Sequence, residues 1–229
     1  MNIRIFSLLL FLMLSMFSVQ ALAQTDPRGF DLRFGIGAPV TYDNIDVKLG
    51  SARVFKEHGR SRGFSTNISL GWRWKYVGLY FDQELGNLWH TSNTDANHEL
   101  VSDISNKNRF IGATYLLVRA FYNFSPEFLI SGGFGIGAIY GTEDKLWYRF
   151  PNVKGKDLFE SAALKVLFEA TFFVTSFIGL GLSFEFAYAN ATQDFWVPDP
   201  EIPYIMQHKV TMHHHIYIIQ PGVHVNFIF

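Results

Sequence analysis

The chain has 229 residues, of which 48% are hydrophobic and 17% aromatic, and its formal net charge is −1. This length fits one all-β domain, and the near-zero charge gives no indication of a nucleic-acid partner. The chain has no cysteine, which excludes the disulfides that stabilise many small exported domains. A closed, hydrogen-bonded barrel is one fold that is stable without them.

Residues 1–23 have the features of a cleavable signal peptide. Arg4 precedes an apolar run from Ile5 to Val19, and Ala21-Leu22-Ala23 fits the small-x-small cleavage pattern. The alternative is a membrane anchor, but a run of about 15 residues is shorter than the roughly 20 that a spanning helix needs. We therefore predict export, with residues 24–229 forming one mature domain.

The mature chain shows apolar residues alternating with small or polar ones, which is the period of a β-strand rather than of a helix. The last such segment contains Pro221, which suggests a bulge or a change of face there. In the fourth segment, we assign the face holding Arg119 and Asn123 to the interior. In chain order, the eight predicted strands are Phe30–Ile36, Ile68–Trp74, Val77–Glu84, Phe110–Phe124, Phe128–Tyr140, Leu164–Val174, Ile178–Tyr188 and Ile216–Phe229.

The connections between these strands alternate in length. Short turns are expected around Lys75–Tyr76, Ser125–Glu127 and Thr175–Phe177. Long polar loops are expected at Ala38–Gly63, Gly86–Asn108, Gly141–Leu158 and Ala189–Thr211. Short turns on one side and long loops on the other are typical of outer-membrane barrels. The sequence therefore predicts an all-β fold, an eight-stranded antiparallel up-and-down transmembrane β-barrel, over residues 24–229.

A soluble β-sandwich would also alternate, but its outward face would be polar. Here one face is almost entirely Phe, Leu, Ile, Val and Tyr, while the other is small and polar, as expected for lipid outside and a polar lumen. Aromatic residues also gather where two interfacial belts are expected. They are Trp72, Trp74, Tyr76, Phe124 and Phe128 near the short turns, and Trp89, Tyr140, Trp147 and Tyr188 at the other end.

The last residues, from Val223 to Phe229, alternate and end in an aromatic residue. This pattern, with Phe227 and Phe229 on one face, resembles the signal that outer-membrane proteins present to the barrel-assembly machinery. Together with the signal peptide and eight strands, it resembles the small outer-membrane barrels of the OmpA transmembrane-domain, OmpX and OmpW type. The resemblance covers the whole mature chain, but it is architectural and carries no family-specific loop motif.

The predicted interior face carries charges of both signs in similar number. An eight-stranded barrel is just wide enough for side chains to fill it. We therefore expect an ion-pair network that closes the lumen, and the alternative is a narrow conducting path or proton relay. Counting residues from the turns places Asp82 or Glu84 beside Arg119, and Glu169 and Glu185 opposite Arg33 or Arg73. The expected network consists of Arg33, Arg73, Asp82, Glu84, Arg119, Lys165, Glu169, Glu185 and His224.

Three consecutive histidines, His213 to His215, invite a metal hypothesis, with His208 nearby. The sequence places no carboxylate or cysteine beside them to complete a four-coordinate site, so we favour a polar cluster at the membrane interface and expect no metal. Barrel enzymes that act on lipids use His with Ser and an acidic or amide residue. No short motif joins such residues here, and we expect no catalytic activity.

The favoured function is a structural or surface-interaction role, exerted through four long extracellular loops on a barrel with a filled lumen. The alternatives are a narrow channel for small hydrophobic or ionic solutes, which the OmpW resemblance implies, and an enzyme that modifies outer-leaflet lipids. We expect a monomer in the bacterial outer membrane, without cofactor or nucleic acid. Its expected partners are membrane lipid, lipopolysaccharide and the barrel-assembly machinery.

Overall fold

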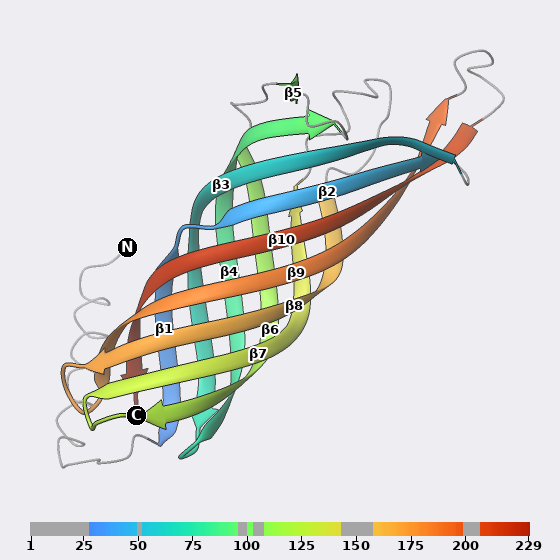
Figure 1. Ribbon diagram of the computed structural model, residues 1–229. Coiled ribbons are helices and arrows are strands. Elements are labelled where there is room, and N and C mark those ends of the chain that lie inside the picture. The colour runs from blue at the N-terminus through green and yellow to red at the C-terminus, as the bar shows by residue number, and fades with distance from the viewer. Residues whose placement is uncertain (1–27, 50–51, 96–99, 103–107, 143–157, 199–206) are drawn as a thin grey trace, which may run out of the picture.

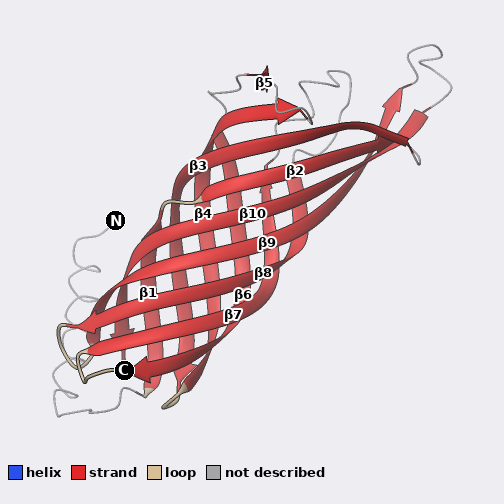
Figure 2. Ribbon diagram, viewed as in Figure 1, coloured by secondary structure: helices blue, strands red, loops and turns tan. Residues whose placement is uncertain are grey.

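The computed structural model describes residues 28–49, 52–95, 100–102, 108–142, 158–198 and 207–229 (Figure 1). The predicted signal peptide, residues 1–23, lies outside the described residues and stays a prediction. Every regular element in the described ranges is a strand (Figure 2). In this part of the chain, no helix is long and apolar enough to cross a membrane.

The described residues form ten strands, and every pairing between them is antiparallel. They are β1 (Gly29–Gly37), β2 (Val40–Leu49), β3 (Ala52–Arg73), β4 (Val77–Asp95), β5 (Leu100–Ser102), β6 (Asn108–Asn123), β7 (Phe128–Thr142), β8 (Leu158–Phe173), β9 (Ile178–Pro198) and β10 (Gln207–Ile228).

These elements close into a barrel of eight strands among the described residues. β1 and β2 form a single barrel strand, because both pair with β3 on one side and with β10 on the other. The short β5 pairs with the end of β4 beyond the barrel ring. The remaining neighbours follow chain order up to β10, which returns to β1 and closes the ring. The predicted eight-stranded antiparallel barrel is confirmed.

The first barrel strand is interrupted at Ala38 and Pro39, opposite Pro221 of β10. The Ala38 amide donates to the Pro221 carbonyl at 2.9 Å. Because the N–H and C=O of one residue in an antiparallel strand point to the same side, the position where Pro221 lacks an N–H also faces this gap. The predicted bulge or change of face at Pro221 is wrong, because β10 keeps its register with β9 through this residue. The absence of an N–H at Pro221 therefore removes no hydrogen bond from the sheet, since the neighbouring strand is interrupted at this position.

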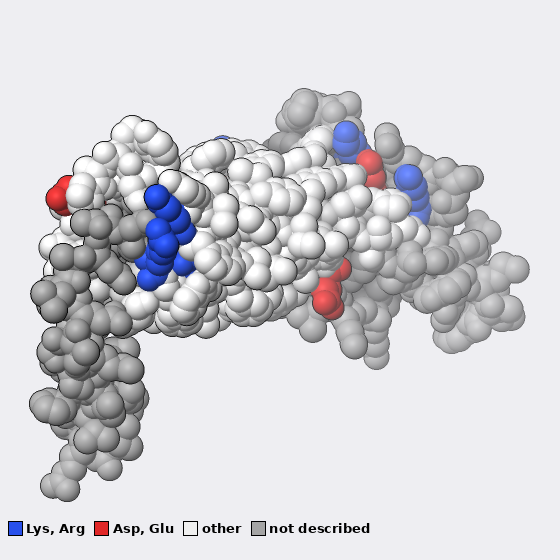
Figure 3. Space-filling model, turned by 90° about the horizontal axis from the view of Figure 1, so that it is seen from below, with Lys and Arg blue, Asp and Glu red and all other residues white. Residues whose placement is uncertain are grey.

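Side chains alternate strictly between the interior and the outer surface. On β1, for example, Asp31 and Arg33 are buried, while Phe30 and Phe34 are exposed. The middle of the outer surface in Figure 3 is free of charged residues, and Lys, Arg, Asp and Glu appear toward the two ends of the barrel. This apolar band is what a lipid environment requires.

The height of the apolar band can be measured along β3. Trp72, which is exposed near the short turns, and Arg62, which is exposed toward the opposite end, are ten residues apart. At a rise of about 3.3 Å per residue and a tilt of about 40°, these positions are separated by roughly 25 Å along the barrel axis. That distance matches the apolar band of outer-membrane barrels.

The predicted extent of the loops is partly wrong. The segment Ala38–Gly63 is a long hairpin, in which β2 and β3 pair from Val40–Arg62 to Leu49–Ala52. In the same way β4 extends to Asp95, β9 to Pro198, and β10 begins at Gln207. Outside the membrane both faces of a strand can be polar, so the alternation that identifies strands is lost there. Most of the third predicted loop, Gly141–Leu158, lies outside the described residues.

Candidate functional site

The interior near the short turns, which we call the turn end, is crossed by three cationic side chains. The first is Arg33 of β1, which is fully buried. Its Nη1 lies 2.5 Å from Oε1 of Glu169, and its Nη2 lies 3.1 Å from Oε1 of Glu185. The two carboxylates come from β8 and β9, neither of which pairs with β1. Arg33 therefore links strands across the lumen rather than along its wall.

Lys165 of β8 makes a second crossing. Its Nζ lies 2.6 Å from Oε2 of Glu185 and 2.7 Å from Oδ2 of Asp82, and it also contacts Glu84. Asp82 and Glu84 are on β4, which is separated from β8 by β6 and β7. One ammonium group thus joins carboxylates from opposite sides of the barrel.

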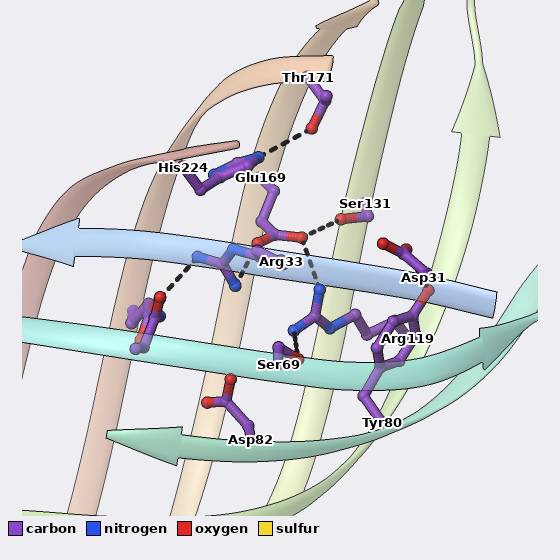
Figure 4. Close-up of polar contacts among 12 residues, drawn as sticks. Asp31, Arg33, Ser69, Tyr80, Asp82, Arg119, Ser131, Glu169, Thr171 and His224 are labelled. Carbon is purple, nitrogen blue, oxygen red and sulfur yellow. Dashed lines mark hydrogen bonds and ion pairs between the residues drawn. The ribbon is translucent and has the colours of Figure 1, made fainter. Parts of the chain in front are cut away.

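Arg119 of β6 makes the third crossing. Its Nη1 lies 3.1 Å from Oε2 of Glu169, its Nη2 donates to Ser69 Oγ at 2.8 Å, and its guanidinium lies over the ring of Tyr80. Figure 4 shows Glu169 between Arg33 and Arg119. The interactions form a continuous series that runs Arg119, Glu169, Arg33, Glu185, Lys165, and then Asp82 and Glu84; we call it the lumen network.

The predicted pairing of Arg119 with Asp82 or Glu84 is wrong. Arg119 is opposite Gly78 in the β4–β6 ladder, while Asp82 is opposite Tyr115. The two positions are therefore offset by four residues, or about 13 Å along the strands. Strands in a barrel are tilted and staggered, so an equal count from two turns does not give equal register. Glu169 of β8, two strands away from β6, contacts Arg119 instead of Asp82.

Two further predicted members lie in the interior but make other contacts. Arg73, at the turn end, donates to Asn123 Oδ1 at 3.1 Å and stacks on the ring of Phe121. His224 of β10 shares a hydrogen bond of 3.0 Å between its Nε2 and Thr171 Oγ1. All nine predicted residues face the interior, and eight of them are buried, with Glu84 half-buried.

Several interior residues were missed from the sequence. The Tyr80 hydroxyl donates to Asp31 Oδ2 at 2.7 Å, and Lys165 Nζ lies 5.2 Å from the centre of the Tyr115 ring. Alternation could have identified Tyr80, which shares a face with Asp82. Hydroxyl and amide groups complete the shell around the carboxylates. They are Ser131 at Glu169, and Asn67 and Gln220 at Glu185.

Beyond the lumen network, the described interior is filled mainly by apolar residues. Leu88, Ile111, Ile139 and Ile216 all point inward and are almost completely buried. A small cavity of about 20 Å³ lies between these residues and Glu84, which is room for about one water molecule. The described interior is thus filled by the charged network toward the turn end and, above it, by apolar side chains packed with the buried polar residues Thr41, Asp43, Ser61 and His214.

The three consecutive histidines separate onto two faces. His214 is buried in the interior, whereas His213 and His215 point outward. His215 Nδ1 lies 2.9 Å from the Tyr188 hydroxyl, and His213 Nδ1 lies 3.3 Å from Thr192 Oγ1. Among the residues that the structure describes, no group of three or more His, Cys, Asp or Glu side chains could hold a metal ion. The outward pair lies in a polar cluster on the surface.

Phe227 and Phe229 lie where β10 meets β1 and closes the barrel. The backbone of Phe229 exchanges two hydrogen bonds with Phe30, at 2.8 and 3.1 Å. Its ring lies 6.3 Å from that of Phe30, and the ring of Phe227 lies 6.3 Å from that of Phe34. Both side chains therefore form part of the outer surface at the closing seam.

Residues 9–199 match the family model described as outer membrane protein beta-barrel domain. The chain belongs to this family. It is therefore an outer-membrane β-barrel, and its location is the bacterial outer membrane. In such barrels the short turns face the periplasm, so we call the turn end periplasmic and the opposite end extracellular.

The chain is similar to several solved structures at low sequence identity. The outer-membrane protein OprG from Pseudomonas aeruginosa is 11% identical, with a TM-score of 0.55 over 88% of this chain and 99% of that chain. Neisserial surface protein A is 13% identical, with a TM-score of 0.44 over 86% and 97%. The outer-membrane protease OmpT from Escherichia coli is 9% identical, with a TM-score of 0.46 over 92% and 99%. A search of curated proteins found no match to the sequence.

Proposed function

We propose that this outer-membrane β-barrel is a closed, non-enzymatic structural barrel that presents its extracellular hairpins at the cell surface. The observation that carries the proposal is the lumen network, in which Arg33 and Lys165 bridge opposite walls of the barrel. A conducting pore needs a continuous path for water and solute. Here the ion pairs and the side chains packed above them occupy that path.

The energetics of buried charges favour a network that stays closed. Each charge in the lumen is removed from bulk water, and this costs several kcal/mol unless partners replace the lost hydration. Glu169 and Glu185 each contact two cations as well as hydroxyl or amide donors. Opening a path would break several of these contacts together.

The extracellular part supports a surface-interaction role. β2, β3, β4, β9 and β10 continue beyond Arg62, where the apolar band ends. Their paired strands extend the barrel wall beyond the apolar band. We propose that these hairpins make the contacts with molecules outside the cell, and that the barrel acts as a monomer.

The alternatives are a narrow channel for small hydrophobic or ionic solutes and a lipid-modifying enzyme. The filled interior argues against the channel. Nδ1 of His213 and Nδ1 of His215 contact the hydroxyls of Thr192 and Tyr188, and neither contact supplies the acidic or amide group that orients a histidine base in such enzymes. We also propose that the barrel-assembly machinery recognises Phe227 and Phe229 when it inserts the protein into the outer membrane.

Conductance of the purified protein in planar bilayers tests the closed barrel. The wild type should show no steady single-channel current in simple salt. The variant Arg33→Ala/Glu185→Ala removes a cation and an anion that meet across the lumen, so it should conduct more and serves as the positive control. Steady single-channel current through the wild type would overturn the proposal. Mass spectrometry of lipid A incubated with the protein tests for enzymatic modification, and we expect no change in its mass.

A further inference from the structure

The extracellular end carries an outward-facing basic surface on β2 and β3, beside β10. It consists of Lys48, Lys56, Arg60 and Arg62, and we call it the rim patch. Arg60 and Arg62 are exposed and the two lysines are half-buried, all on the face of the strands that points away from the lumen. None of them takes part in the lumen network.

Strand register places the rim patch directly above an aromatic row. Tyr217, Tyr42 and Arg60 are aligned across β10, β2 and β3. The Arg60 guanidinium lies 5.5 Å from the centre of the Tyr42 ring. Arg62 is aligned with the exposed Trp89 of β4. Tyr and Trp favour the headgroup level of a membrane, so the two arginines emerge at that level.

The next two rows are polar and lie farther from the membrane core. The first aligns His215, Asn44 and His58, and the second aligns His213, Asp46 and Lys56. His58 Nδ1 lies 2.6 Å from Asn44 Oδ1. Lys56 is four residues beyond Arg60, or roughly 10 Å farther along the barrel axis at the tilt of such strands. The patch therefore spans the depth of lipid headgroups.

The charge of this surface is one-sided. Lys48 lies one row farther out, aligned with Thr211 of β10. Among the described side chains of these rows and of the Lys48 row, the four cations face a single carboxylate, that of Asp46. The wall on the other side of the barrel differs. There, the outward residue at the extracellular end of β8 is Glu160, which is aligned with Tyr140 of β7. Among the described side chains of the extracellular rim, basic residues are thus concentrated on this sector.

We propose that the rim patch binds the phosphate groups of an outer-leaflet glycolipid, the lipid A part of lipopolysaccharide. Arginine presents paired donors that match phosphate oxygens, and lysine adds point charges. The acyl chains would lie on the apolar residues below Tyr42 and Tyr217, so that one molecule contacts both the apolar band and the patch. The inference is independent of whether the lumen conducts.

Lipid binding to the folded, detergent-solubilised protein can be measured by native mass spectrometry. The probes are lipid A, chemically dephosphorylated lipid A and phosphatidylglycerol. Arg60→Gln/Arg62→Gln and Lys48→Gln/Lys56→Gln are tested in parallel, so that the result does not depend on one variant folding. The matched control is Arg28→Gln/Lys75→Gln, which makes the same charge change at exposed positions of the periplasmic end.

Each rim double variant should bind lipid A on the order of tenfold more weakly than the wild type, because each basic residue near an anionic membrane surface contributes appreciably to binding. The control should bind like the wild type, and dephosphorylated lipid A should bind weakly to all forms. Unchanged lipid A binding by the rim variants would overturn the proposal. An equal loss for dephosphorylated lipid A, or for phosphatidylglycerol, would also overturn it, because phosphate on the glycolipid would not be what the patch recognises.

Discussion

Arg33 of β1 and Glu185 of β9 meet inside the barrel, with Arg33 Nη2 lying 3.1 Å from Glu185 Oε1, although 152 positions separate them in the chain. Both side chains are almost completely buried. The pair therefore joins the first and the seventh barrel strand through the lumen, and the stability of the closed barrel should depend on it.

The first prediction concerns this pair. Arg33→Ala should lower the free energy of unfolding by about 3–5 kcal/mol, because it leaves buried carboxylate charge without its partner. Arg33→Ala/Glu185→Ala should recover part of that loss, since the charges are again balanced. Urea titration of the protein folded in lipid vesicles measures both. Lys75→Ala at the exposed periplasmic turn is the control, and an Arg33→Ala variant as stable as this control would contradict the prediction.

The second prediction separates the observed partner of Arg119 from the one that the sequence suggested. A double-mutant cycle with Arg119→Ala and Glu169→Gln should give a coupling energy of about 0.5–3 kcal/mol, as for residues in direct contact. The cycle of Arg119→Ala with Asp82→Asn should be additive to within about 0.5 kcal/mol. Stronger coupling to Asp82 than to Glu169 would show that the strand register differs from the one described.

The third prediction concerns the seam between β10 and β1. Phe229→Asp should sharply reduce insertion into the outer membrane, because it puts a charge on the outer surface where Phe229 packs against Phe30. Phe229→Tyr keeps the ring and should insert normally. Insertion is measured as the heat-modifiable band on SDS gels of isolated outer membranes. Equal amounts of that band for both variants would show that the aromatic ring has no part in assembly.

The fourth prediction concerns export. Intact-mass spectrometry of the protein from outer membranes should give a mature chain that begins at Gln24, as expected from the Ala21-Leu22-Ala23 cleavage pattern. Ala23→Leu should slow cleavage, because the site requires a small residue, and a longer precursor should accumulate. A mature protein that still carries Met1 would show that the apolar segment is retained.

Much of the fold could be predicted from local pattern alone. Each residue in a strand faces the side opposite to that of its neighbour, so the parity of Arg33, Asp82 and Glu169 was enough to place all three in the interior. The same rule separates His214 from His213 and His215. Because lipid requires an apolar outer face, the alternation was strongest within the membrane, where it identified all eight strands and the three short turns.

Tertiary structure decided the contacts between strands. The stagger of a closed barrel determines which interior residues share a level, and this quantity is absent from any single strand, so Arg119 contacts Glu169 and not Asp82. The long β2–β3 hairpin was missed because water on both faces removes the constraint that produces alternation. In the same way, Pro221 was expected to disturb β10, but the gap at Ala38 and Pro39 lies on the neighbouring strand, and only the assembled barrel brings the two together.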